Sequence, residues 1–242
     1  MSVYQKLLDI LEKPSSKKKY LIGLIDPDKK NKINLQNQID YIKNDECFCA
    51  VLVGGSLIMD SGYNSRIELI KKSVNLPVIA FPSSSNQINK NFDAIFFLSL
   101  ISGRNAQYLI GEQVISAPII YDLKIESIPI GYILLDGGRR SSVEIVSNTT
   151  PLPMDNHDIV IAHSLAAEYL GHKFIYFECG SGAFNFIDLD LLAAVKKCIS
   201  IPIIVGGGIK NKEDASLIRN AGADLIVVGS MIENKINNES AN

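Results

Sequence analysis

Short apolar segments recur about eight times along the chain, and most are continuous runs of Ile, Val, Leu and Phe rather than alternations of apolar and polar residues. Such runs are typical of parallel strands that are buried on both faces. Amphipathic stretches that fit helices lie between several of them, at 65–74, 157–170, 188–198 and 212–221. We expect the strands at Tyr20–Ile25, Cys49–Val53, Pro77–Phe81, Ala94–Leu98, Gly131–Leu135, Lys173–Phe177, Ile201–Val205 and Asp224–Val228.

This alternation predicts a single-domain α/β fold, the (β/α)8 TIM barrel, in its standard or a modified form. The chain has 242 residues, 47% of them hydrophobic, which is near the usual length of one such barrel. We assign residues 1–233 to the barrel and expect the polar tail 234–242 to fray. Residues 103–128 fit the repeat least well, because 104–113 resembles a helix and the apolar piece 117–123 resembles an inserted segment.

Charge and composition narrow the class of protein. Acidic and basic residues are interspersed and the net charge is −2, which does not favour a nucleic-acid partner. No apolar run approaches the roughly twenty residues of a transmembrane segment, and the N-terminus resembles an amphipathic helix rather than a signal peptide. The four cysteines lack metal-ligand spacing and suit a reducing compartment. We therefore expect a cytoplasmic protein.

Two glycine-ended strands near the C-terminus predict a phosphate site. The sequence is IIVGGGI at 203–209 and GADLIVVGS at 222–230, so each apolar strand ends in glycine where a helix should begin. Glycine lets backbone N–H groups approach an anion closely, and the N-terminus of the next helix adds the positive end of its dipole. In (β/α)8 barrels a phosphate clamp commonly lies after strands seven and eight. This pair therefore indicates a phosphorylated ligand.

Other strands end in polar side chains at the same rim of the expected barrel, where active sites of this fold lie. Asp26 directly follows the first strand, and Ser56 follows the second after two glycines. Oxygen ligands of this kind can hold Mg²⁺ together with substrate phosphates. The alternatives are a capping or turn-ordering role for Asp26 and a helix N-cap for Ser56.

Tyr176 and Glu178 alternate with Phe177 along the sixth strand, so both side chains should face the barrel interior. They stand just before the glycine-rich segment 180–182. A carboxylate and a phenol in this position could hydrogen-bond a polyol and help to remove a proton from a hydroxyl group. The alternative is a buried pair that satisfies itself or a neighbouring lysine.

The chain resembles the geranylgeranylglyceryl phosphate synthases and the related bacterial heptaprenylglyceryl phosphate synthases over nearly its whole length. The resemblance depends on the order of the motifs LIDPDK (24–29), VGGS (53–56), FPSSSNQ (81–87), SLISGRN (99–105), YFECGSGA (176–183), VGGGI (205–209) and VGS (228–230). It implies a prenyltransferase of phospholipid biosynthesis. The reaction would transfer a polyprenyl group from its diphosphate to the C3 hydroxyl of sn-glycerol 1-phosphate, with release of pyrophosphate. The expected polyprenyl group is geranylgeranyl.

The resemblance also implies roles for the matching residues. Asp26 and Ser56 would bind the Mg²⁺ that meets the diphosphate, while Glu178 and Tyr176 would act in catalysis. Members of such a family are often oligomers, so we expect a dimer or a hexamer. The residues expected to bind sn-glycerol 1-phosphate are Tyr176, Phe177, Glu178, Cys179, Gly180, Ser181, Gly182, Gly207, Gly208, Gly229 and Ser230.

Two positions depart from the family pattern. Leu24 stands where some bacterial members carry lysine, and Lys29 or Arg104 could supply a contact to the diphosphate instead. Cys179 stands where an alanine is often found, and this small-for-small change should leave the backbone intact.

Two other functions remain open. A sugar-phosphate isomerase could use Asp26 and Asp136 as an acid–base pair, although strands three and four end without the second glycine clamp that such an enzyme would want. A non-catalytic barrel that binds a phosphorylated ligand would keep the clamp without a metal site.

Overall fold

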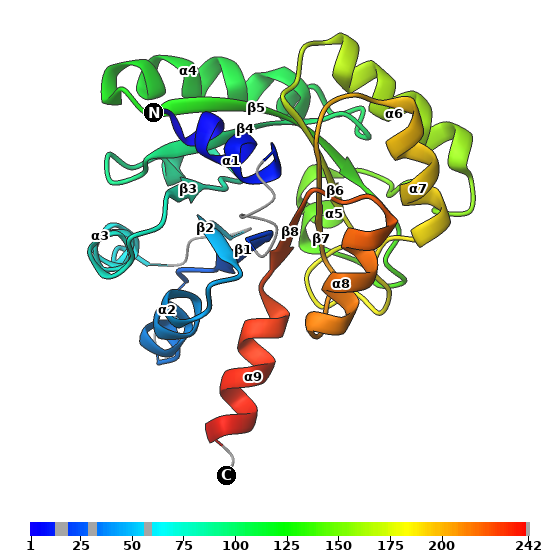
Figure 1. Ribbon diagram of the computed structural model, residues 1–242. Coiled ribbons are helices and arrows are strands. Elements are labelled where there is room, and N and C mark those ends of the chain that lie inside the picture. Colours follow the sequence, from blue (N-terminus) through cyan, green and yellow to red (C-terminus); the bar gives the residue numbers. More distant parts are fainter. Residues whose placement is uncertain (13–18, 29–32, 56–59, 241–242) are drawn as a thin grey trace. The chain divides into compact units, whose positions relative to one another are not determined.

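The structure is a computed structural model that describes residues 1–12, 19–28, 33–55 and 60–240. Helices and strands alternate along the chain (Figure 1). The strands are β1 (Leu21–Ile25), β2 (Phe48–Val53), β3 (Val78–Ala80), β4 (Ala94–Leu100), β5 (Glu126–Leu134), β6 (Phe174–Glu178), β7 (Ile203–Gly206) and β8 (Leu225–Val228). The helical elements are α1 (Val3–Glu12), α2 (Leu35–Asn44), α3 (Tyr63–Ser73), η3 (Ser85–Gln87), η4 (Gln107–Gly111), α4 (Glu112–Leu123), α5 (Ser142–Ser147), α6 (His157–Tyr169), α7 (Leu189–Cys198), α8 (Lys212–Ala221) and α9 (Ser230–Ser240).

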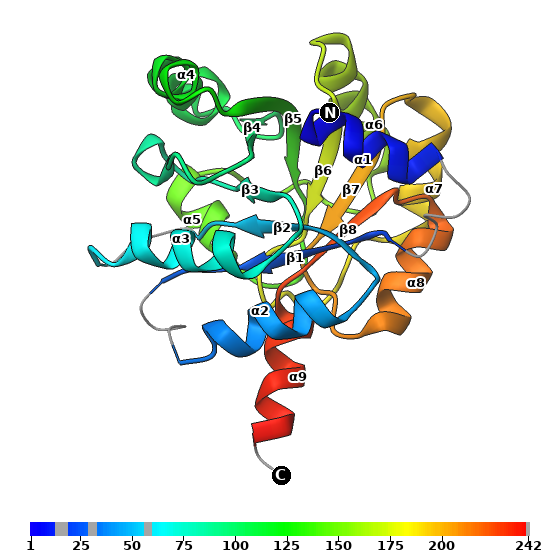
Figure 2. The ribbon, with the colours of Figure 1, turned by 60° about the vertical axis from the view of Figure 1, so that its left-hand side comes forward.

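The eight strands form a closed barrel in the order of the sequence, which confirms the predicted (β/α)8 fold (Figures 1 and 2). Neighbouring strands pair in parallel, for example β1 with β2 and β6 with β7. The predicted strand positions hold to within a few residues except for β5, which begins at Glu126 rather than near Gly131. In the described part of the chain, no helix has both the length and the apolar character needed to cross a membrane.

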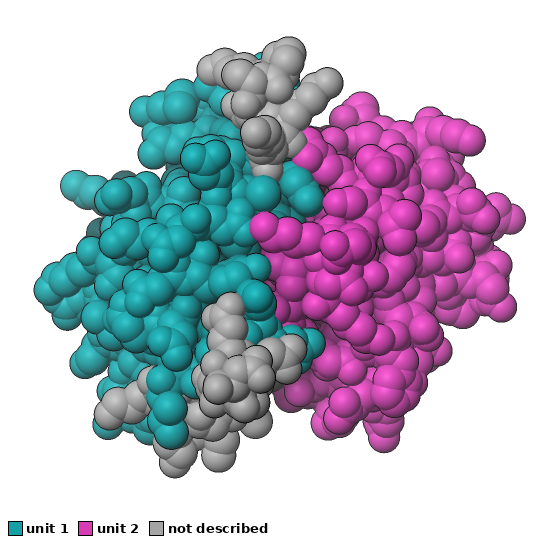
Figure 3. Space-filling model, turned by 60° about the horizontal axis from the view of Figure 1, so that its bottom comes forward, with its two compact units in different colours: residues 1–96, 114–128, 232–242 teal, residues 97–113, 129–231 magenta. Residues whose placement is uncertain are grey.

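The chain divides into two compact units, which Figure 3 colours separately. The N-terminal unit comprises residues 1–96, 114–128 and 232–242 and contains β1, β2 and β3. The C-terminal unit comprises residues 97–113 and 129–231 and contains β6, β7 and β8. Each unit has its own buried strands, since every residue of β2 in the first and of β6 in the second is buried. Burial on both faces explains the continuous apolar runs.

Several helices begin at side-chain caps that the sequence encodes locally. Asn156, Asp188 and Asn211 accept the backbone N–H of Ile159, Leu191 and Asp214, at the start of α6, α7 and α8. Each cap satisfies one of the N–H groups that the first turn of a helix leaves without a partner. The helix boundaries in this part of the chain are therefore close to those expected.

Residues 117–123, expected as an inserted segment, form the second half of α4, so that prediction is wrong. The π-helical turn η4 leads directly into α4, and Lys124 then turns the chain toward β5 with a φ of 54°. Helix α4 carries apolar residues on its exposed side, among them Val114 (64% exposed) and Tyr121 (87% exposed). Its sequence therefore lacks the amphipathic spacing that marks a surface helix.

The polar C-terminal segment is also more regular than expected. Helix α9 begins at Ser230 and extends to Ser240, so residues 234–240 are helical rather than frayed. Polar residues continue a helix readily when the first turn is anchored, and Met231, Ile232 and Ile236 of α9 are buried.

Glu126 at the start of β5 anchors the N-terminus of α1 within the N-terminal unit. Its carboxylate accepts the Val3 N–H at 2.5 Å and the Tyr4 N–H at 2.9 Å. The first turn of a helix presents free N–H groups and the positive end of the helix dipole, so a carboxylate there is stabilising.

We expect Glu126→Gln to lower the free energy of unfolding by about 1 kcal/mol, because the amide keeps one acceptor but loses the charge. Urea unfolding at neutral pH measures the change. Glu12→Gln, on the exposed last residue of α1, is the matched control and should behave like the wild type. Equal unfolding midpoints for the two variants would contradict the anchoring role of Glu126.

Candidate active site

The carboxyl group of Glu178 lies at the C-terminal end of β6, and only 7% of the residue is exposed. Its Oε1 accepts the Gly180 N–H at 2.7 Å, and the nearby hydroxyl groups of Tyr132 and Tyr176 also favour the charged carboxylate. Burial outweighs these interactions and raises the pKa of Glu178 to about 7. A carboxyl group that titrates near neutral pH is suited to accept a proton from a bound hydroxyl group.

Tyr132 is a site residue that the sequence analysis missed. In the parallel pairing of β5 with β6, Tyr132 stands beside Tyr176 and Leu134 beside Glu178. The two tyrosine rings stack with centroids 5.2 Å apart and planes inclined by 17°. Burial, with the nearby Glu178 carboxylate, raises the pKa of both hydroxyl groups, so both stay protonated and can donate to Glu178.

The glycines that end β7 are required by their close approach to β6. A Cβ on Gly206 would lie 2.3 Å from Tyr176 Oη, and a Cβ on Gly207 would lie 2.6 Å from Glu178 Oε1. Gly207 and Gly208 also have φ of 87° and 73°, a region that side chains disfavour. Gly207 therefore lies directly against the carboxyl group, and an anion held by its backbone N–H group would be next to Glu178.

The other half of the predicted clamp lies at the end of β8. Gly229 follows β8, and Ser230 is the first residue of α9, where free N–H groups and the helix dipole favour an anion. β8 pairs in parallel with β7, with Val227 beside Gly206, so the two glycine ends lie at one edge of the sheet. The structure thus brings both parts of the clamp together within the C-terminal unit.

The loop after Glu178 contains the remaining residues of the predicted substrate segment. Gly180 and Gly182 have positive φ, of 100° and 68°, and Ser181 and Gly182 are exposed. Phe177 is buried on the opposite face of β6 from Glu178, so only its backbone is available to a ligand at this site. Burial raises the pKa of the Cys179 thiol above its usual range, which keeps the sulfur neutral.

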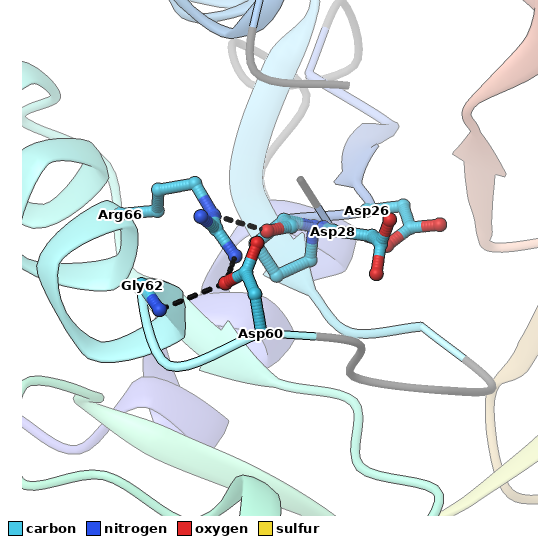
Figure 4. Close-up of polar contacts among 6 residues, drawn as sticks. Asp26, Asp28, Asp60, Gly62 and Arg66 are labelled. Atoms are coloured by element: carbon cyan, nitrogen blue, oxygen red, sulfur yellow. Dashed lines mark hydrogen bonds and ion pairs between the residues drawn. The ribbon is translucent and has the colours of Figure 1, made fainter. Parts of the chain in front are cut away.

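A second polar group lies at the end of β1, in the N-terminal unit (Figure 4). The Oδ1 of Asp26 accepts the Asp28 N–H at 3.1 Å, across Pro27. Gly55, after β2, packs against this carboxylate, because a Cβ there would lie 2.5 Å from Asp26 Oδ1. Figure 4 shows the carboxyl groups of Asp26 and Asp28 on the side of the turn away from Arg66.

Gln87, which ends the motif at 81–87 but was given no role of its own there, joins the loops after β2 and β3. It is 1% exposed, and its Nε2 donates to the Gly55 carbonyl at 2.9 Å and to Ser83 Oγ at 2.7 Å. The Tyr63 hydroxyl donates in turn to the Gln87 carbonyl at 3.0 Å. These bonds hold the backbone of Gly55, which packs against Asp26. Ser56, the second predicted metal ligand, lies outside the described residues.

The donors after β1 fit a hard cation that is shared with a substrate. Asp26 and Asp28 offer carboxylate oxygens, whereas the described residues hold no group of three His, Cys, Asp or Glu side chains that could enclose a metal ion. Mg²⁺ usually keeps several waters and takes one or two carboxylates together with phosphate oxygens. The carboxylate oxygens of Asp26 and Asp28 are therefore donors of the kind that Mg²⁺ binds.

Three other predicted residues have different outcomes. Lys29 lies outside the described residues. The Arg104 guanidinium donates to the carbonyls of Gly103 and Ile101 and lies 3.3 Å from His163 Nε2, so its contact with a diphosphate stays a prediction. Asp136, proposed for an isomerase, is exposed and its Oδ1 accepts the Gly138 N–H at 2.9 Å, which orders a turn.

Together the fold and these strand-end groups define a (β/α)8 barrel with a buried carboxyl group beside the glycine-rich end of β7. Comparison with known proteins is more specific, since the profile of the PcrB family matches residues 14–241. A geranylgeranylglyceryl phosphate synthase of Flavobacterium johnsoniae is 42% identical over 225 residues, which cover 93% of this chain and 92% of the relative. One of Chitinophaga pinensis is 40% identical over 218 residues, 87% of this chain and 83% of the relative.

Solved structures agree with this result. The crystal structure of (S)-3-O-geranylgeranylglyceryl phosphate synthase from Thermoplasma acidophilum, in complex with sn-glycerol 1-phosphate, superposes with a TM-score of 0.87 at 33% identity and covers 100% of this chain and 95% of its own. The chain belongs to the PcrB family, with relatives that are geranylgeranylglyceryl phosphate synthases, a class of prenyltransferase.

The pKa of Glu178 predicts a pH-dependent stability. Because the folded protein holds this proton up to about pH 7 and the ordinary value is 4.5, ionisation favours the unfolded chain as the pH rises through that window. Relative to Glu178→Gln, the wild type should lose about 3 kcal/mol of unfolding free energy between about pH 4 and about pH 8. Urea titrations of both proteins measure the difference. A constant difference across this range would show that Glu178 has an ordinary pKa.

Proposed function

We propose that this protein transfers a polyprenyl group from its diphosphate to the C3 hydroxyl of sn-glycerol 1-phosphate, and that the preferred group is geranylgeranyl. The C3 oxygen forms a bond to the first carbon of the prenyl chain, the bond from that carbon to the diphosphate breaks, and pyrophosphate leaves. The product is an ether-linked lipid precursor. Membership of the PcrB family and the position of Glu178 against the glycine clamp support this proposal.

The glycerol phosphate would bind in the C-terminal unit. Gly207, Gly208, Gly229 and Ser230 would hold the phosphate through backbone N–H groups, and the segment 176–182 would line the glycerol. A phosphate fixed at the clamp brings the glycerol hydroxyl groups toward Glu178, which lies against Gly207. Fixing one reactant in this way lowers the entropic part of the barrier.

Glu178 would take the proton of the C3 hydroxyl as the new bond forms. Its pKa of about 7 allows it to be ionised at neutral pH and still be basic enough to accept a proton. The hydroxyl groups of Tyr132 and Tyr176 favour the charged carboxylate, and they would orient it, which would make Tyr132 a positioning residue of the same site.

Asp26 would hold the Mg²⁺, together with Ser56 in the family pattern. When bound there, the ion would neutralise the negative charge that builds on the leaving diphosphate. The Asp26 carboxylate is kept in place by the Asp28 N–H and by the close packing of Gly55.

The deciding experiment supplies purified protein with labelled sn-glycerol 1-phosphate, Mg²⁺ and prenyl diphosphates of graded length. We expect label to move into an organic phase only when Mg²⁺ is present, and the best chain length identifies the donor. Asp26→Ala should abolish this transfer, whereas Asp40→Ala on the exposed face of α2 should not. Binding of glycerol phosphate without transfer of any prenyl chain would favour a non-catalytic barrel. If the protein does not bind glycerol phosphate either, the sugar-phosphate isomerase becomes the favoured function.

Glu178→Gln should lower kcat/KM by at least about tenfold, because a charged hydrogen-bond acceptor and the proton acceptor are both lost. In the wild type kcat/KM should rise with pH through about 7 as the carboxylate forms, and in the variant this rise should be absent. Glu213→Gln, on the exposed start of α8, serves as the control. Wild-type kinetics in Glu178→Gln would assign this residue a purely structural role.

We also propose a cytoplasmic homo-oligomer, either a dimer or a hexamer. The exposed apolar side chains of α4, including Val114, Ile115 and Tyr121, support self-association, since monomeric proteins rarely expose such a group. The cysteines at 47, 49, 179 and 198 are all free, as is usual in a reducing compartment.

A further inference from the structure

Arg66 holds the turn that carries Asp26, although it is remote from that residue in the sequence. It lies on α3, and only 10% of its side chain is exposed. Its Nε donates a hydrogen bond to the Pro27 carbonyl, and its Nη2 lies 2.7 Å from Asp60 Oδ1 (Figure 4). The buried guanidinium therefore binds the backbone carbonyl of Pro27, which lies between the two acidic residues of the turn, Asp26 and Asp28.

The peptide that joins Pro27 to Asp28 is held at both ends. Its carbonyl accepts from Arg66, and its N–H donates to Asp26 Oδ1 at 3.1 Å. In a planar trans peptide these two groups point in opposite directions, so fixing the carbonyl also fixes the direction of the N–H. The charge of the guanidinium polarises the peptide and strengthens the second bond.

The Arg66 side chain is itself positioned by its neighbours. Asp60 pairs with it and also accepts the Gly62 N–H at 2.8 Å. Gly62 leaves the space that the guanidinium occupies, because a Cβ there would lie 2.6 Å from Arg66 Nη1. The backbone of Gly62 has a φ of −81°, which any residue adopts, so the requirement for glycine is one of space.

We infer that Arg66 is a positioning residue for the Asp26 carboxylate, acting through the Pro27–Asp28 peptide. This inference rests on the proposed function, in which Asp26 holds Mg²⁺ with the prenyl diphosphate. With Oδ1 engaged by the peptide, the orientation of the carboxylate is set before the ion and the diphosphate arrive. Residues that orient metal ligands in this way typically change metal affinity about 10- to 100-fold when they are replaced.

Two variants test the inference by different routes. Arg66→Lys keeps the charge that pairs with Asp60 but loses the forked guanidinium that binds Asp60 and Pro27 together. Gly62→Ala keeps Arg66 and the backbone conformation but displaces the guanidinium. Lys72→Gln, which removes an exposed ion pair with Glu68 on the same helix, is the control.

The first readout is binding of Mn²⁺, as a probe for Mg²⁺, in the presence of inorganic pyrophosphate, followed by electron paramagnetic resonance. The second is the Mg²⁺ concentration that gives half-maximal prenyl transfer. We expect both variants to weaken Mn²⁺ binding and to raise the Mg²⁺ requirement by about tenfold. The KM for sn-glycerol 1-phosphate and the circular dichroism spectrum should stay as in the wild type and in Lys72→Gln.

Other outcomes overturn one claim or the other. Wild-type Mn²⁺ binding in either folded variant would refute the positioning role, and so would equal losses in the affinities for both substrates. If wild-type protein binds Mn²⁺ with pyrophosphate in an Arg66-dependent way but transfers no prenyl group, the proposed function fails and the role of Arg66 stands. If the wild type transfers prenyl groups but Mn²⁺ binding does not depend on Arg66, the proposed function stands and the positioning role of Arg66 fails.

Discussion

The burial of one carboxyl group, that of Glu178, is the constraint on which the rest of the C-terminal unit depends. A carboxylate away from water needs hydrogen-bond donors, and here the Gly180 N–H donates from the next loop while two stacked tyrosines on adjacent strands also favour the charged form. The approach of Gly206 and Gly207 leaves no room for side chains on β7 at this point. In the proposed function the backbone N–H groups of Gly207 and Gly208 would hold the phosphate next to the carboxyl group that would act as the base.

In the N-terminal unit, too, a glycine packs against a carboxylate oxygen at the end of a strand. Asp26 Oδ1 lies against Gly55 much as Glu178 Oε1 lies against Gly207, since a Cβ on either glycine would fall within 2.6 Å of the oxygen. In both cases a backbone N–H two residues further along the chain donates to the carboxylate. The difference is exposure. Glu178 is buried, and its raised pKa suits a base near neutral pH. The Asp26 residue is more exposed to solvent, which suits a carboxylate that binds a hydrated cation.

Much of the site was predictable from short motifs, because glycines and carboxylates directly after an apolar run are local signals. Tyr176, Glu178 and the two glycine ends lie together within one unit, as the sequence indicates. Tyr132 and Arg66 were missed, and Gln87 was noted only as part of a motif. Each acts through a partner far along the chain, Glu178 for Tyr132, Pro27 for Arg66 and Gly55 for Gln87, and no local pattern marks such pairs.

The fold class and the chemistry of the strand ends follow from the amino-acid sequence, because burial on both faces of parallel strands demands continuous apolar runs and close backbone approach demands glycine. Where those signals fail, so does the prediction. Residues 117–123 were misassigned because α4 is apolar on its exposed side as well, and the pattern that separates helix from strand is then lost. Strand register and side-chain contacts across the sheet decided which tyrosine meets Glu178 and which arginine orients Asp26, because these are long-range contacts that exist only once the chain has folded.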